Sequence, residues 1–225
     1  MIDNLKINIH KRNRKTLSIY IERDGSLTVY APENLLQNEI DAILQKREYQ
    51  IYRYRAKWEL LNANRISREA VNGQSFLYLG RNYYLQFSND VKSLMLKGKY
   101  FYLPESKREN LPEAFKEFYR EKGKAFITPR VFQFAEKMGV KPEEISILEL
   151  KNRWASCSIK KPRVNFNWKV MMAPVTVLDY LIVHELAHFK FKKHDSAFWN
   201  EVDKILPNYQ KQLDWLKRYG ASLTV

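Results

Sequence analysis

Residues 174–199 read PVTVLDYLIVHELAHFKFKKHDSAFW, and this stretch holds three of the four histidines in the 225-residue chain. The proline suits the first turn of a helix, and the apolar residues after it recur at helical spacing. Side chains four residues apart on a helix lie one above the other, so His184 and His188 can offer two imidazoles to one ion. The stretch therefore predicts a buried helix, from Pro174 to about Phe189, that carries an HExxH metal-binding motif.

The third metal ligand must come from outside this helical turn. A catalytic zinc site takes three protein ligands and leaves the fourth position to water. His194 lies six residues beyond His188 and is the first candidate. Glu201 or Asp203 would instead give a site of two histidines and one carboxylate. We predict one Zn²⁺ per chain, held by His184, His188 and His194.

The carboxylate beside the first histidine is not needed as a ligand. Zinc lowers the pKa of its water toward ~7, and Glu185 is placed to take the proton and pass it to a leaving amine. Glu185 is therefore the predicted general base and acid. Hydrolysis also needs a donor for the developing oxyanion, and Arg153, Tyr180 and Tyr209 are candidates.

The motif also has a purely structural interpretation, because HExxH strings occur by chance on amphipathic helices. Here the apolar neighbours predict burial, and two unpaired imidazoles and a carboxylate in a core are costly without a metal. The spacing to His194 matches the metzincin pattern HExxHxxGxxH, although Phe191 stands where that pattern has glycine. The metal site is the favoured interpretation.

The composition is strongly basic: 39 Lys and Arg against 25 Asp and Glu give a formal charge of +14. Such an excess can attract nucleic acid, an anionic membrane or an acidic protein, or aid solubility. The single cysteine, Cys157, excludes an intramolecular disulfide and fits a reducing compartment. It is either an inert buried side chain or a thiolate ligand. Without a signal peptide or a long apolar run, we expect a cytoplasmic protein with no membrane insertion.

Residues 1–106 predict three antiparallel hairpins and one long helix. The hairpins pair residues 17–21 with 27–30 across Asp24-Gly25, 76–79 with 83–87, and 93–96 with 100–103. The helix spans about residues 35–62, which contain no glycine or proline.

Residues 107–225 predict a second domain with more helix. Residues 114–126 form a helix that Pro129 separates from a second helical stretch, which ends near Gly139. Strands follow at 145–150 and 163–168, and residues 195–218 are helical with a break at Pro207. The predicted fold class is α+β, with a domain boundary at 106/107.

Several strings resemble the YgjP-like metallopeptidase family, which is related to SprT-like zincins. They are RWASCS at 153–158, Asn167-Trp168, the HELAH motif, and HDSAFW at 194–199. The hairpin around FLYLG at 76–80 is similar to the same family's amino-terminal region, so the resemblance covers most of the chain. It implies a zincin catalytic domain with a small sheet, with His184, His188 and His194 as ligands and Glu185 as the catalytic residue. One departure is Ala155, where the family has glycine in a WGSC-like string.

The segment 153–168 is expected to form an edge strand beside the cleft, where an extended peptide can pair with its backbone. Trp154, Ser156 and Asn165 are then candidate substrate contacts. The alternative is a core tryptophan followed by a polar hairpin turn.

The predicted function is a zinc-dependent peptidase acting on protein or peptide substrates. One alternative is a nucleic-acid-binding protein, or a protease recruited to nucleic acid, suggested by KRNRK at 11–15 and KKPR at 160–163. Another is a metal-dependent amidase for a small substrate, because the metal chemistry does not require a peptide.

Overall fold

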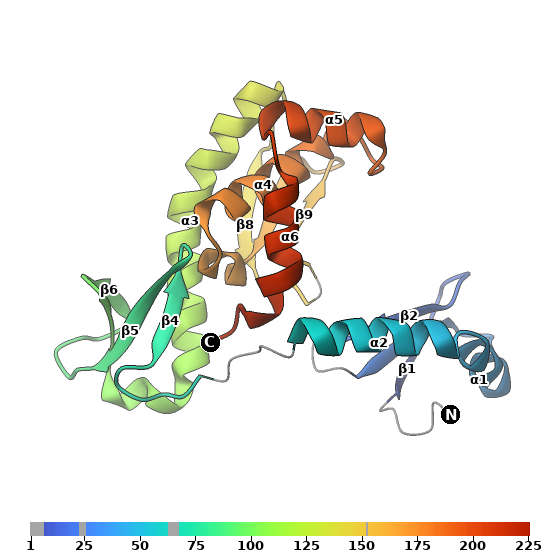
Figure 1. Ribbon diagram of the computed structural model, residues 1–225, viewed down its shortest axis with the longest axis horizontal. Coiled ribbons are helices and arrows are strands. Elements are labelled where there is room, and N and C mark those ends of the chain that lie inside the picture. Colours follow the sequence, from blue (N-terminus) through green and yellow to red (C-terminus); the bar gives the residue numbers. More distant parts are fainter. Residues whose placement is uncertain (1–6, 23–25, 63–67, 152) are drawn as a thin grey trace. The chain divides into compact units, whose positions relative to one another are not determined.

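The computed structural model describes residues 7–22, 26–62, 68–151 and 153–225. The chain forms two compact units, Met1–Arg65 and Ile66–Val225, and Figure 1 colours them along the sequence. Helices and small sheets alternate along the chain, which confirms the α+β class. None of the helices in the described part is both long and apolar enough to cross a membrane.

The first unit is built on a three-stranded sheet with the order β1-β3-β2. Its strands are β1 (Ile7–Arg12), β2 (Ser18–Ile21) and β3 (Leu27–Pro32). The expected β2–β3 hairpin is present, but its Asp24-Gly25 turn lies outside the described residues. β1 runs parallel to β3, contrary to the expected antiparallel arrangement. Alternating apolar residues give the same pattern in both pairings, so the sequence does not distinguish them.

Two helices replace the single long helix expected after this sheet. α1 (Gln37–Lys46) and α2 (Glu48–Asn62) are separated at Arg47, whose backbone N–H donates to the carbonyls of Ile43 and Leu44, both at 3.1 Å. The prediction was wrong because no glycine or proline marks the break. Apolar side chains from both helices still pack on the sheet: Ile40, Leu44 and Ile51 are at most 3 % exposed.

The second unit begins with a four-stranded sheet of order β4-β5-β7-β6. Its strands are β4 (Ser75–Tyr78), β5 (Arg81–Phe87), β6 (Met95–Lys97) and β7 (Tyr100–Leu103). Both expected hairpins are confirmed, and a parallel β5–β7 pairing joins them. The 3₁₀ turn η2 (Glu105–Asn110) then leads into α3 (Leu111–Met138).

This sheet and α3 share one core of fully buried aromatic rings. Phe76 stacks on Phe115 at 4.3 Å between ring centroids, and Phe101 lies 5.0 Å from the same ring. The expected boundary at 106/107 therefore falls inside the second unit, and the compact units divide at 65/66. Hairpin and helix patterns alone do not reveal that two elements bury their apolar faces against each other.

α3 continues through Pro129, contrary to the expected division at that residue. Proline removes one helical hydrogen bond at a cost of about 3 kcal/mol. Burial of Ile127, Val131 and Phe134 on the same helix offsets this cost. The helix ends as expected at Gly139, whose φ of 65° is the left-handed conformation that glycine adopts readily.

A second small sheet has the order β8-β10-β9. β8 (Glu144–Leu148) and β10 (Arg163–Asn167) are parallel, and β9 (Ala155–Ser158) is antiparallel to β10. Of residues 153–168, β9 lies at an edge of this sheet and β10 lies at its centre, so they do not form one edge strand as expected.

Helices complete the unit after the turn η3 (Trp168–Met172). They are α4 (Val175–Ala187), α5 (Ser196–Ile205) and α6 (Gln210–Tyr219), with the short turn η4 (Gly220–Ser222) at the end. The break between α5 and α6 contains Pro207, as expected.

Two contacts hold α4, the helix of the HExxH motif. The β4–β5 turn reaches its start, where Leu79 N–H donates to the Met171 carbonyl at 2.8 Å. On α3, the Arg130 guanidinium donates two hydrogen bonds, of 2.8 and 2.7 Å, to the Asp179 carboxylate on α4. The helix is thus fixed at its beginning and along one side.

Candidate metal centre and cleft

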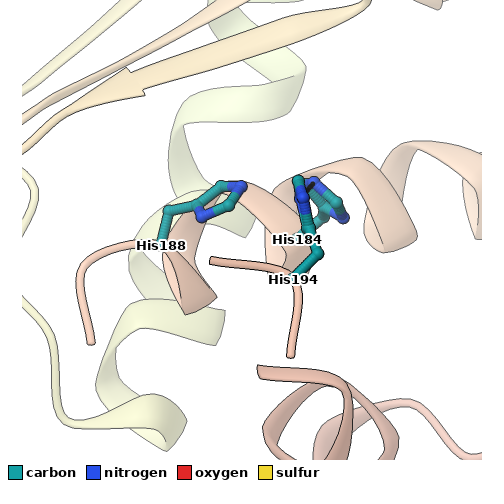
Figure 2. Close-up of side chains that lie close together, drawn as sticks. All are labelled: His184, His188 and His194. Carbon is teal, nitrogen blue, oxygen red and sulfur yellow. Dashed lines mark hydrogen bonds between the residues drawn. The ribbon is translucent and has the colours of Figure 1, made fainter. Parts of the chain in front are cut away.

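Three imidazoles converge at the end of α4. His184 lies in the last turn of the helix, His188 caps it, and His194 comes from the loop that leads to α5. Figure 2 shows the three side chains close together. One ring nitrogen from each lies within 4.8 Å of the other two, and the Nε2 atoms of His184 and His194 are 3.1 Å apart.

Neighbouring groups orient two of these rings. His188 Nδ1 lies 3.0 Å from the backbone carbonyl of Phe191. A carbonyl only accepts, so Nδ1 carries the proton and Nε2 has a free lone pair. His184 Nδ1 lies 3.4 Å from the Tyr180 hydroxyl, which leaves its Nε2 directed to the cluster. Such outer hydrogen bonds are typical of metal-binding histidines.

The loop between the second and third histidines closes without glycine. Phe191 does not have a positive φ, and its N–H donates to the Ala187 carbonyl at 2.9 Å. Asp195 then starts α5 by accepting a hydrogen bond from Phe198 N–H at 3.1 Å. The chain turns back with ordinary backbone conformations, which explains how phenylalanine occupies the metzincin glycine position.

The environment favours the neutral form of His184 and His194. Burial, reinforced by His188 and His194, lowers the pKa of His184 to about 3. Burial also lowers the pKa of His194, again with a contribution from His188. Neutral imidazole is the form that binds a metal, so the lowered pKa values of these two side chains favour metal binding.

Glu185 is a buried carboxyl group beside this cluster, with 7 % exposure. Burial raises the pKa of Glu185 to about 7, while a hydrogen bond with the Cys157 thiol and the charge of Arg153 oppose the rise. A carboxyl group with a pKa near neutrality can both accept and return a proton, as general acid–base chemistry requires.

Stacked aromatic rings form a wall along the cluster. Trp199 stacks on His194 at 5.6 Å between ring centroids and on Tyr209 at 5.2 Å. Tyr209 in turn stacks on Tyr180 at 6.2 Å. Burial raises the pKa of Tyr180 to about 12, so its hydroxyl stays protonated beside His184. The wall restrains the exposed imidazole of His194 and the tyrosine that contacts His184.

The alternative ligands lie elsewhere. The Glu201 carboxylate accepts a hydrogen bond from Lys190 Nζ at 2.6 Å, and Asp203 is exposed on α5. Cys157 is a free thiol directed to Glu185. Among the described residues, only His184, His188 and His194 form a group of three donors close enough for one ion.

A cleft of about 330 Å³ opens beside His184 and Glu185. Its walls come from the start of β9 and from α4 and α6. The remaining lining residues are Arg153, Trp154, Ala155, Tyr180, Leu181, Leu213, Leu216 and Lys217. The cleft is therefore largely apolar, with two cationic side chains.

Of the three expected substrate contacts, the structure places one at the cleft and two outside it. Trp154 lines the cleft, and its ring packs at Gly220, where an added Cβ would lie 2.9 Å from it. Ser156 on β9 and Asn165 on β10 are neighbours, and the Asn165 amide donates to Ser156 Oγ at 3.4 Å. Neither residue lines the cleft. Alternation along β9 places Ser156 on the face opposite Ala155 and Cys157.

Of the expected oxyanion donors, Arg153 and Tyr180 line the cleft, and Tyr209 does not. A further residue, not expected from the sequence, supports Arg153. Asn167 is 1 % exposed, and its amide donates to the carbonyls of Leu150 at 2.7 Å and Arg153 at 3.2 Å. Leu213 and Lys217 were not expected in the cleft either, and their spacing of four on α6 is the only sequence signal for a shared face.

A helix carrying two histidines and a buried carboxyl group, with a third histidine folded back beside them, is the arrangement of a metal-dependent hydrolase. The comparisons with known proteins agree with this class. The model of the YgjP-like metallopeptidase domain matches residues 15–219. The chain therefore belongs to the YgjP-like metallopeptidase family.

Two solved structures are similar to part of the chain. The metallopeptidase zymogen abylysin of Pyrococcus abyssi is 25% identical, and the match covers 40% of this chain and 91% of that one, with a TM-score of 0.38. The metallopeptidase zymogen jannalysin of Methanocaldococcus jannaschii is 27% identical over 40% of this chain and 89% of that one, with a TM-score of 0.36. No curated protein matches the chain.

Proposed function

We propose that this protein is a zinc-dependent endopeptidase, with His184, His188 and His194 as ligands and Glu185 as general base and acid. The observation that carries the proposal is the convergence of three imidazoles beside a buried carboxyl group. Membership of a metallopeptidase family supports the reaction class.

The donor set fits zinc. Two nitrogens bound at about 2.0–2.1 Å in tetrahedral geometry lie about 3.3 Å apart, and His184 Nε2 and His194 Nε2 are 3.1 Å apart. Three neutral imidazoles leave one tetrahedral position for water or substrate. When bound, zinc polarises a carbonyl and makes water more acidic.

The chain's own residues handle the proton. Glu185 accepts a proton from water at its carboxylate and returns it to the amine that leaves the cleaved peptide bond. Its carboxyl lines the cleft with His184, so it is within the space that a substrate enters. The Cys157 thiol holds this carboxyl by a hydrogen bond.

The edge strand and the cleft orient the substrate in this proposal. An extended peptide pairs with the free edge of β9, and one of its side chains enters the apolar cleft beside Trp154 and Leu213. Arg153 and Lys217 favour a substrate with negative charge close to that side chain. We also propose the cytoplasm as its location, because Cys157 is a free thiol.

The test compares wild-type protein with Glu185→Gln for zinc content and for cleavage of an unfolded protein. We expect one zinc per chain in both, because Glu185 is not a ligand, and a loss of turnover of at least about 100-fold in the variant. Glu201→Gln, on a carboxylate paired with Lys190, is the matched control and should keep both properties. Failure of well-folded wild-type protein to take up zinc would refute the proposal.

A further inference from the structure

The sheet of the first unit packs one face on α1 and α2, and its opposite face carries the buried Thr28 beside more exposed side chains. Leu27, Val29 and Ala31 of β3 are buried with residues of α1 and α2. Side chains alternate along a strand, so Thr28 and Tyr30 point to the opposite face. The strand register places His10 and Ser18 beside Tyr30, and Tyr20 beside Thr28.

Four side chains form a continuous platform on this face: His10, Arg12, Tyr20 and Tyr30. The His10 ring stacks on Tyr30 at 5.4 Å between ring centroids, and the Tyr20 ring meets the same tyrosine edge-on at 5.7 Å. The Arg12 guanidinium lies 4.7 Å above the Tyr30 ring. His10 and Arg12 are exposed, and Tyr20 is 45% exposed, so parts of the platform are open to solvent.

The platform is also positively charged. Arg14 donates a hydrogen bond to Ser18 Oγ at 2.6 Å, which brings a second guanidinium to the side of Tyr30. Among the described residues, neither Arg12 nor Arg14 forms an ion pair. The described strand residues on this face include no carboxylate.

We propose that this platform binds single-stranded nucleic acid, with bases stacked on the exposed rings and guanidinium and with phosphates at Arg12 and Arg14. Aromatic rings interleaved with cations on an open sheet are suited to unstacked bases, since every base offers a flat face. An acidic peptide would use the cations but not the rings, and a duplex would not expose its bases. The inference concerns the first unit and does not depend on the proposed peptidase site.

The experiment measures binding of fluorescent single-stranded RNA and DNA of mixed sequence to the full chain by anisotropy over a range of salt concentrations. We expect binding that weakens with salt. Tyr20→Ala should weaken binding by about tenfold through loss of stacking. Arg12→Gln should lower the salt slope by roughly 0.7 for one lost phosphate contact.

Two controls separate this site from general effects. Tyr84→Ala removes another tyrosine that is 45% exposed, on β5 of the second unit, and should leave binding within twofold of wild type. Tyr20→Phe keeps the ring and should restore binding. Far-ultraviolet circular dichroism checks that the variants are folded.

Several results would overturn the proposal. One is that wild-type protein does not bind at low salt. Another is that Tyr20→Ala and Arg12→Gln both keep the wild-type affinity. A third is that Tyr84→Ala loses as much affinity as Tyr20→Ala. Equal affinity for a duplex of the same sequence would also exclude base stacking on the platform. A preference between RNA and DNA would show whether the 2′-hydroxyl adds to the stacking that both share.

Discussion

Glu185 and Cys157 form a contact that links the sheet to the site. β9 delivers the thiol and α4 delivers the carboxyl, and their hydrogen bond opposes the effect of burial on the pKa of Glu185. Burial raises the pKa of Cys157 to about 12, so this sulfur remains a neutral donor rather than a thiolate. The cysteine lies outside the group of three histidines and contacts the carboxyl group of Glu185.

The raised pKa of Glu185 makes the stability of the metal-free protein depend on pH. The folded-state pKa of about 7 exceeds the ordinary 4.5, so stability from the protonated carboxyl is present below about 4.5 and is lost as pH rises through 7. After chelation, we expect the unfolding free energy of wild type to fall relative to Glu185→Gln by about 2 kcal/mol between pH 5 and 8. His184 titrates in both proteins, so the difference isolates Glu185. Urea unfolding measures it, and a pH-independent difference would contradict the assignment.

The third ligand can be tested at the level of single residues. His194→Ala should lower zinc affinity by roughly 100-fold or more. Even the loss of a residue that only hydrogen-bonds to a ligand typically lowers metal affinity by about 10–100-fold. Glu201→Gln and Asp203→Asn should bind zinc as wild type does, because these carboxylates lie outside the histidine cluster. Competition with a chromophoric chelator gives the affinities. Weak zinc binding by Glu201→Gln combined with normal binding by His194→Ala would assign the ligand to α5 instead.

At the level of elements, the site depends on what holds α4. The β4–β5 turn donates backbone hydrogen bonds to η3, and α3 holds Asp179 through Arg130. Gly80 in this turn has φ of +77°, and an added Cβ would lie 2.8 Å from the backbone of Pro174, where α4 begins. The turn and the helix are therefore in direct contact at a position that tolerates no side chain.

Gly80→Ala should be more destabilising than the same change at Gly98. Both glycines have positive φ, which costs alanine about 1–2 kcal/mol, but an added Cβ at Gly98 meets nothing within 4 Å. We expect Gly80→Ala to cost at least about 1 kcal/mol more, because Pro174 must move. Thermal or urea unfolding of the two variants checks this. Equal losses would mean that the turn does not brace α4.

At the scale of the whole chain, the two units differ in the size of their hydrophobic cores. Among its described residues, the first unit buries six apolar side chains. The second unit combines both small sheets and the last four helices in one core. Residues 66–225 contain all of the proposed metal ligands and the entire cleft. The second unit therefore has what it needs to fold and to bind metal.

A truncation experiment distinguishes the two possible boundaries. A fragment of residues 66–225 should unfold cooperatively and bind zinc, because its core is intact. A fragment of residues 107–225 should aggregate or lack cooperative unfolding, since it exposes rings that pack on Phe76 and Phe101, among them Phe115 and Phe118. Circular dichroism and zinc content report both outcomes. Cooperative folding of the shorter fragment would favour the boundary at 106/107.

Local patterns predicted most of the elements but not their boundaries in long helices. The hairpins, the α4 helix and the ends of α3 and α6 follow from alternation, capping residues and periodicity. The continuity of α3 through Pro129 and the break at Arg47 do not, because burial outweighs the cost of the proline and the break has no glycine or proline to mark it.

For the site, the sequence alone determined the HExxH helix, because the spacing of His184, Glu185 and His188 is a property of one helical turn. Tertiary structure decided which distant groups join them. It placed His194 rather than Glu201 beside His184, brought the Cys157 thiol to Glu185, and assembled the cleft from β9, α4 and α6. These contacts depend on how elements pack against one another, and packing depends on faces and distances that no local spacing encodes.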